Sequence, residues 1–132
     1  MSADSVELVE RAFAAYREGG VDAVMPLCAA DVVWHFDAEE SVEDLAYRGR
    51  EGIRGAYEVW IESLDDFGWD VHAIRDLGGR VLVLADITGL SRDTGAAARF
   101  STNLLVDVRE GLIQEVRTFI DLDRALAAGR EV

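Results

Sequence analysis

One histidine stands out as a side chain that could do acid–base chemistry in this sequence. His72 precedes the pair Gly78-Gly79, which is typical of a tight turn between two strands. If that turn is a two-residue hairpin, His72 pairs with Ala85, and its side chain faces the cavity on the concave side of the sheet. A neutral imidazole can accept or donate a proton near pH 7, so His72 is the first candidate for general acid–base catalysis. The alternative is an outward-facing histidine, because a shift of one residue in register reverses its side.

A second group of side chains is suited to binding and orienting a ligand. Buried Tyr hydroxyls and Trp indoles need hydrogen-bond partners, so several of them together suggest a pocket of mixed character for a planar or polycyclic molecule. The aromatic members are Tyr16, Trp34, Phe36, Tyr57 and Trp60, and the polar members, in the centres of predicted strands, are Asn103 and Thr118. The alternative is that the aromatic residues are ordinary core.

For three further residues, the neighbouring sequence indicates whether the side chain has a structural or a chemical role. Asp86 lies in the apolar run Val81-Leu-Val-Leu-Ala-Asp-Ile-Thr88, where a carboxylate needs a partner, and we expect Arg117 or Arg99 to supply it. This ion pair is structural or, alternatively, catalytic. Asp37 follows the first predicted strand and is expected at the rim of a cavity. Cys28 has no basic neighbour in sequence and is expected to be a buried, inert thiol.

Hydrophobic periodicity predicts the elements that must position these residues. Period-3.6 patterns indicate helices over 5–18, 21–28 and 51–64, with Pro26 in the first turn of the second helix or kinking it. The segment 31–36 is predicted to be a strand, and 41–50 is acidic and irregular. From Gly68 the period becomes 2, which predicts an antiparallel meander of strands over 68–76, 80–92, 98–109 and 112–121, followed by a short helix over 121–128. The order indicates an α+β fold in which helices close the concave face of a curved sheet, as one domain over 1–132.

Composition excludes several classes of protein. The chain has 132 residues, is 50% hydrophobic and carries a net charge of −13, so it should fold, and binding to nucleic acid or to an anionic membrane is disfavoured. No apolar run is long enough to span a membrane, and the N-terminus does not resemble an export signal, so we expect a cytoplasmic protein. With one Cys and two His, no disulfide or metal site is expected, and no motif for a cofactor is found.

The apolar runs of the predicted strands bear on oligomeric state. Val81-Leu82-Val83-Leu84 and Leu104-Leu105-Val106 are apolar at consecutive positions, which indicates that both faces of the sheet are covered. The three predicted helices of the N-terminal half cover only one face. The sequence therefore predicts a homodimer formed through the convex face.

Several short motifs together resemble the nuclear transport factor 2-like (NTF2-like) superfamily, and within it the SnoaL-like proteins. The resemblance runs from Val9 to Gly129 and rests on Gly19-Gly-Val-Asp22, Ala30-Asp-Val-Val-Trp34, Tyr47-Arg-Gly-Arg-Glu-Gly52, Gly89-Leu-Ser-Arg-Asp-Thr-Gly95, Arg109-Glu-Gly111 and Arg117-Thr-Phe-Ile-Asp121 followed by Arg124-Ala-Leu126. It implies a cone of helices on a curved sheet. That superfamily contains isomerases, epoxide hydrolases, polyketide cyclases, ligand-binding proteins and protein-docking modules, so the resemblance does not define a reaction.

Two enzymatic branches of the superfamily are not matched at their reactive positions. Ketosteroid isomerases use a tyrosine, a carboxylate base and a protonated acid, where this sequence has Ala12, Phe36 and Asn103. Limonene-epoxide-hydrolase-like enzymes use an Asp-Arg-Asp set, and the matching positions are Ala85, Ile87 and Thr118.

The requirement of SnoaL-type cyclases, an acid–base group near the cavity, can still be met. The resulting hypothesis is a cofactor-free cyclase, isomerase or hydratase acting on an apolar, carbonyl-bearing metabolite. In it His72 exchanges the proton, Asn103 and Tyr16 donate hydrogen bonds to the enolate oxygen, and Trp34 and Trp60 hold the ring. The competing hypothesis is a non-catalytic ligand-binding or protein-docking module with the same cavity.

Overall fold

The N-terminal part of the chain forms two helices separated by a glycine. The computed structural model describes residues 2–36, 45–119 and 122–130. Helix α1 (Ser2–Gly19) ends where Gly20 adopts a φ of 71°, and the N–H of Gly20 donates to the carbonyl of Tyr16. Helix α2 (Val21–Val24) continues as a 3₁₀ helix, η1 (Met25–Leu27), at Pro26. The α-helix stops there because proline has no N–H to donate.

Two paired strands precede the third helix. Strand β1 (Cys28–Phe36) pairs antiparallel with β2 (Leu45–Arg48), so Tyr47 lies opposite Trp34. The prediction of an irregular segment over 41–50 is therefore wrong for 45–48, which form a strand, and for 49–50, which are helical, while 41–44 lie outside the described residues. Helix α3 (Gly49–Ser63) follows directly. At Gly52 a Cβ would lie 2.7 Å from the carbonyl carbon of Tyr47, so only glycine permits α3 to approach β2 this closely.

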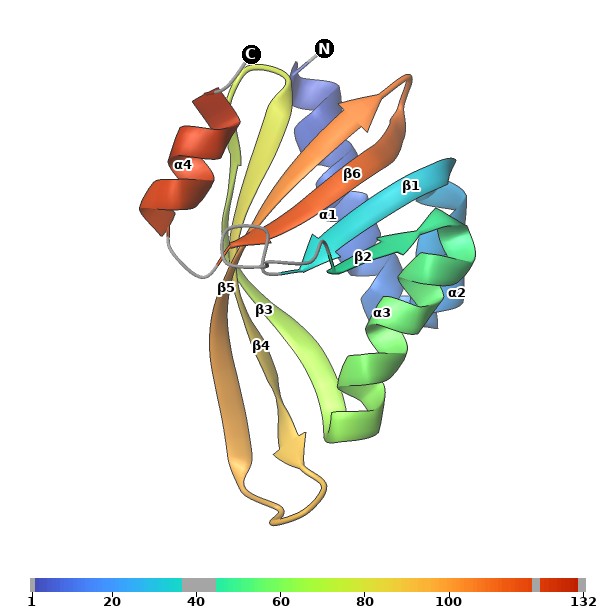
Figure 1. The fold of residues 1–132 in the computed structure, drawn as a ribbon, viewed down its shortest axis with the longest axis vertical. Helices are drawn as coiled ribbons and strands as arrows, with labels where there is room; N and C mark the ends of the chain where they lie inside the picture. The colour runs from blue at the N-terminus through green and yellow to red at the C-terminus, as the bar shows by residue number, and fades with distance from the viewer. Residues whose placement is uncertain (1, 37–44, 120–121, 131–132) are drawn as a thin grey trace.

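The remaining strands form the predicted meander. They are β3 (Leu64–Asp76), β4 (Arg80–Ser91), β5 (Ala97–Arg109) and β6 (Leu112–Phe119). In the described residues the sheet has six strands in the order β2-β1-β6-β5-β4-β3, and only β1 and β6 are parallel. The expectation of an α+β fold with helices against a curved, mostly antiparallel sheet is confirmed (Figure 1).

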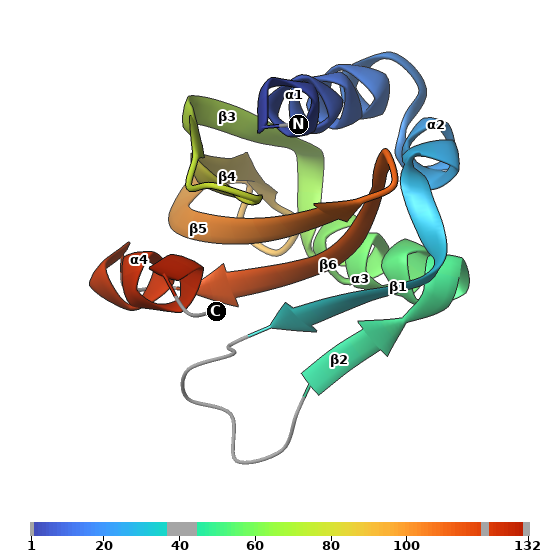
Figure 2. The same ribbon diagram turned by 90° about the horizontal axis from the view of Figure 1, so that it is seen from above.

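Helices cover both faces of the sheet. Figure 2 shows α1 on one side and α4 (Leu122–Arg130) on the other. Val81 and Val83 of β4 pack into the core beneath α1, whereas Leu82 and Leu105 pack against Ala125 of α4. The dimer through the convex face was predicted because apolar residues there needed to be covered. The terminal helix α4 already covers some of these residues. None of the helices in the described residues is long and apolar enough to cross a membrane.

Strand β5 extends well beyond the end of β6. The pairing of β5 with β6 begins at Asn103, opposite Phe119, whereas β5 pairs with β4 from Ala97 onward. Within the described residues, 97–102 thus have a strand neighbour on one side only. Figure 1 shows the consequence: β3, β4 and β5 project together as an arm, and the end of α3 packs alongside it.

The packing of α4 on the convex face predicts a large effect of a core truncation there. Leu105 is 0% exposed and packs in the α4 cluster, so Leu105→Ala should lower the free energy of unfolding by about 2–5 kcal/mol in urea titrations. The matched control is Leu90→Ala, whose side chain is 39% exposed and which should cost less than about 0.5 kcal/mol. Equal losses in the two variants would contradict the packing described here.

Candidate functional site

A pocket of about 540 Å³ opens beside Thr118, near the last described residue of β6, where β5 extends further. This volume is within the range of about 300–1,000 Å³ that is typical of small-molecule sites. All three tryptophans of the chain line it. The lining residues are Trp34, Trp60, Trp69, Ile87, Arg99, Phe100, Ser101, Thr102, Leu104 and Thr118. We call this space the outer pocket.

A hydrogen bond between neighbouring strands fixes one wall of the outer pocket. The indole Nε1 of Trp34 on β1 donates to Oγ1 of Thr118 on β6 over 2.9 Å. A threonine hydroxyl has one proton and can accept as well as donate. Thr118 accepts from Trp34, and among the described residues no acceptor is found for its own proton, so that proton can be donated to a ligand. The wall thus combines a buried, fixed indole with a neutral hydrogen-bond donor.

The other aromatic rings come from α3 and the arm. Trp69 lies beside Trp34 with a centroid distance of 6.4 Å and an interplanar angle of 22°. Trp60 stacks on Phe67 at 6.3 Å and contacts Phe100, also at 6.3 Å. Nε1 of Trp60 is buried and has no acceptor among the described residues. The rings on α3 and on the arm form apolar surfaces on two sides of the pocket. The indole N–H of Trp60 is an unpaired hydrogen-bond donor at the border of the pocket.

A smaller cavity of about 60 Å³ lies deeper in the cone and shares Trp34, Trp69 and Leu104 with the outer pocket. Its two titratable residues are Cys28 and Tyr57. Burial raises the pKa of Cys28 to about 11 and raises the pKa of Tyr57 above its ordinary value, so both groups are neutral at pH 7. Among the described residues, no carboxylate or histidine lines either cavity.

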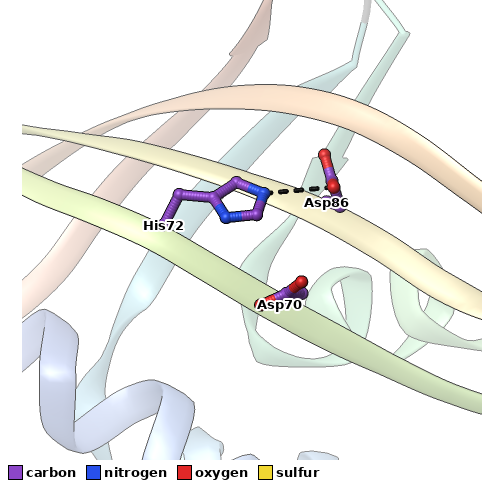
Figure 3. Close-up of side chains that lie close together, drawn as sticks. All are labelled: Asp70, His72 and Asp86. Carbon is purple, nitrogen blue, oxygen red and sulfur yellow. Dashed lines mark ion pairs between the residues drawn. The ribbon is translucent and has the colours of Figure 1, made fainter.

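His72 lies on the convex face and not in a cavity. The turn is a two-residue hairpin as predicted, since Leu77 N–H donates to the Arg80 carbonyl and Ala73 pairs with Leu84. A β-bulge then intervenes, so Ala85 pairs with Val71, and His72 is the extra residue. The expected placement of His72 opposite Ala85 and facing the cavity is therefore wrong. Its Nε2 lies 3.1 Å from Oδ2 of Asp86 (Figure 3).

Asp86 is the centre of an ion-pair network on that face. Arg99 lies with its guanidinium 2.7 Å from Asp86 Oδ2 and 2.8 Å from Asp70 Oδ2, so the prediction of Arg99 as the partner of Asp86 is confirmed. Hydrogen bonds from Arg99 and, second, from His72 lower the pKa of Asp86. Ligand atoms of Asp70, His72 and Asp86 lie within 4.8 Å of one another, as in a metal site. The Arg99 guanidinium already supplies the positive charge at these carboxylates.

The other two members of the predicted catalytic set also lie outside the cavities. Asn103 pairs with Leu84 on the convex side, and its Nδ2 donates to the carbonyl of Phe119 over 3.1 Å. Tyr16 of α1 stacks on Tyr57 at 4.9 Å, and burial raises its pKa. The fold thus separates His72 and Asn103 from Tyr16 by the thickness of the sheet.

The predicted ligand-binding residues are largely brought together. Trp34, Trp60 and Thr118 meet in the outer pocket, and Tyr57 lines the inner cavity. The backbone of Phe36 pairs with Leu45, but its side chain, like all of Asp37, lies outside the described residues.

Sequence reasoning predicted Trp34, Trp60 and Thr118 as ligand-binding residues and missed the other lining residues of the outer pocket, among them Trp69, Phe100 and Thr102. The alternation of Phe67, Trp69 and Val71, which all pack on the main core, is a period-2 signal that could have found Trp69.

The chain belongs to the SnoaL-like domain family, whose model matches residues 9–116. A search of curated proteins finds no match. Similar solved structures include a "Putative SnoaL-like polyketide cyclase" from Jannaschia sp. CCS1, with a TM-score of 0.75 and 20% identity over 99% of this chain and 95% of that one.

Two more solved structures show the same fold. One is a hypothetical protein with a ketosteroid isomerase-like fold from Catenulispora acidiphila DSM 44928, in complex with trimethylamine, with a TM-score of 0.73 and 21% identity over 92% of this chain and 90% of that one. The other is an NTF2-like protein from Burkholderia thailandensis E264, with a TM-score of 0.75 and 22% identity over 96% and 97%. At these identities the likeness establishes the NTF2-like fold.

The ion-pair network predicts how stability depends on pH. Because folding lowers the pKa of Asp86, its stabilising effect is present above the unfolded-state pKa of about 3.9 and is lost as the pH falls through the lower folded-state pKa. In urea titrations at a series of pH values, Asp86→Asn should reduce the loss of stability below about pH 4. Asp93→Asn, in the exposed β4–β5 turn, is the control and should keep the wild-type profile. Identical profiles for all three proteins would refute this role of Asp86.

Proposed function

We propose that this protein binds a planar, largely apolar small molecule that carries a carbonyl group, in the outer pocket. The observation that supports this proposal is the set of three indole rings around about 540 Å³ of space, next to a threonine hydroxyl whose proton is available. Flat aromatic walls favour a flat ligand, because stacking buries both faces of its ring. The Thr118 hydroxyl would donate to the carbonyl oxygen.

The charge distribution favours a ligand without negative charge. The chain carries a net charge of −13, so an anion is repelled over the whole approach to the pocket. The cationic guanidinium of Arg99 is engaged by Asp70 and Asp86 on the other face of the sheet. The binding energy would therefore come from apolar contact and neutral hydrogen bonds.

Catalysis by a SnoaL-like cyclase is the second candidate function. In its favour, a solved structure with the same fold is named as a polyketide cyclase, and the Thr118 hydroxyl is suited to stabilise a developing enolate oxygen. Such a reaction also needs a base at the substrate. The described residues that line the cavities supply none, so binding without turnover is the function that the geometry supports better.

The homodimer through the convex face remains a prediction. The prediction was based on the apolar residues of that face, and α4 covers part of them. The part of the face that α4 leaves uncovered carries the Asp70–His72–Asp86–Arg99 network. Light scattering at micromolar concentration is the measurement that decides it.

Ligand binding can be measured directly, because every tryptophan of the chain lines the outer pocket. A planar quinone such as 2-methyl-1,4-naphthoquinone should quench the intrinsic fluorescence in a saturable manner. Thr118→Val removes the hydroxyl and should weaken binding about 2- to 10-fold, as expected for one neutral hydrogen bond. Thr118→Ser keeps the hydroxyl and should retain most of the affinity.

The control for this experiment is Thr88→Val, whose hydroxyl donates to the Gly68 carbonyl outside the pocket lining. It should bind as wild type does. Absence of saturable quenching across planar ketones and quinones would remove the binding proposal.

The two candidate functions differ in one observable. Incubation with linear poly-β-ketone substrates, followed by mass spectrometry and absorbance, should show no cyclised product above the uncatalysed background. Because His72 lies on the convex face, His72→Ala should leave any measured turnover unchanged. Rapid cyclisation that disappears in His72→Ala would establish the enzyme and contradict the assignment made here.

A further inference from the structure

The inner cavity adjoins the outer pocket at three side chains that line both spaces, those of Trp34, Trp69 and Leu104. Trp34 and Trp69 lie side by side with a centroid distance of 6.4 Å. A flat ring that stacks on either indole in the outer pocket therefore lies next to the inner cavity. A substituent on the inward edge of that ring is directed toward the cavity.

The lining of the inner cavity favours hydrocarbon over polar groups. Helices α1, α2 and α3 contribute Ala12, Val24 and Ile53, and the sheet supplies the opposite wall. Apart from Cys28, all its described lining residues are aliphatic or aromatic, and burial keeps both the Cys28 thiol and the Tyr57 phenol neutral. Apolar cavities in proteins stay dry and accept apolar molecules. An alkyl group that enters such a space gains dispersion contacts without displacing bound water.

We propose that the inner cavity receives a short alkyl substituent of the ligand that the outer pocket binds. This inference rests on the binding function proposed above and specifies the class of molecule, a planar, neutral carbonyl compound with an alkyl group on its ring.

The volume of the inner cavity sets the length of the alkyl group. A methyl or methylene group is close in size to a water molecule, whose share of liquid volume is about 30 Å³. The cavity has about 60 Å³ and therefore holds about two such groups. A longer chain would have to displace buried side chains such as Val24 and Ile53, and close-packed interiors resist such displacement.

A homologous series of ligands measures this length. The probes are 4-quinolones with hydrogen, methyl, ethyl, propyl or pentyl at carbon 2, which are planar, neutral and unreactive toward thiols. Isothermal titration calorimetry of the wild-type protein should show affinity that increases about 4-fold for each of the first two carbons. The propyl and pentyl compounds should bind no more tightly than the ethyl compound.

Filling the inner cavity should remove this gain. Ala12 lines the inner cavity but not the outer pocket, and Ala12→Val adds two carbon atoms there. In this variant the ethyl compound should bind no more tightly than the unsubstituted one. The matched control is Ala15→Val, on the same helix at a partly buried residue that lines neither space. It should keep the preference for the ethyl compound, about 10-fold or more.

Enlarging the inner cavity should shift the preference in the opposite direction. Val24→Ala removes two carbon atoms from the lining, so the propyl compound should become the tightest binder. The matched control is Val81→Ala, a buried valine of the same core that lines neither space, and here the ethyl compound should remain the tightest. Thermal midpoints establish that each variant is folded at the temperature of the titration.

The outcomes separate this inference from the function on which it rests. If no compound of the series binds the wild-type protein, the binding function itself fails. If all bind with equal affinity, if affinity continues to increase up to pentyl, or if Ala12→Val and Val24→Ala both keep the wild-type order, the outer pocket binds planar ligands but the role of the inner cavity is refuted. A preference for the ethyl compound that Ala12→Val removes and Ala15→Val keeps supports it.

Discussion

The packing of helices on both faces of one curved sheet is the constraint on which the rest of the structure depends. The last described residue of β6 is Phe119, and α4, which begins at Leu122, packs on the convex face. Within the described residues, β3, β4 and β5 extend past Phe119 as an arm. The end of α3 packs on this arm through Trp60. The outer pocket lies between this arm and the rings of Trp34 and Trp60.

The hydrogen bond between Trp34 and Thr118 turns this gap into a defined wall. It joins β1 and β6 close to the end of β6, and a buried indole that is both stacked and hydrogen-bonded has little freedom to move. The wall is therefore present before any ligand arrives, which reduces the ordering cost of binding. On the opposite side, Phe100 is exposed and belongs to the arm, so that wall is less constrained.

Local patterns were sufficient for most of the fold but not for the placement of His72. The helices and the meander follow from periodicity and from turn residues, which are properties of short segments. The position of His72 depended on counting register from the Gly78-Gly79 turn, and the count is correct as far as Ala73. The bulge that follows falls at Val71-His72-Ala73, where the sequence has no glycine or proline to indicate it. Strand β2 was missed because its four residues are too few for periodicity to register.

The residues that sequence reasoning placed correctly share a physical cause. Asp86 was expected to have Arg99 or Arg117 as partner because a carboxylate in an apolar strand needs compensation, and that requirement holds whichever face the strand buries. Likewise Trp34 and Trp60 lie at the cavity because burial of large aromatic rings is favourable, and Thr118 accepts the hydrogen bond that the buried Trp34 indole requires. In this protein, the free-energy cost of burying a side chain predicted its position more reliably than counting the strand register from a turn.

The same cost explains why the titratable candidates do not lie in the pocket. Burying a charged group without a partner is expensive, and this chain gathers Asp70, His72, Asp86 and Arg99 on the face that water reaches. Among the described residues that line the inner cavity, the titratable groups are Tyr57 and Cys28, and burial keeps both neutral at pH 7. Selectivity in such a site has to come from shape and from neutral hydrogen-bonding groups such as the Thr118 hydroxyl. A search of the sequence for chemically reactive side chains gives such groups little weight, because a strand-centre threonine becomes a candidate only when the fold places it beside an indole and a cavity.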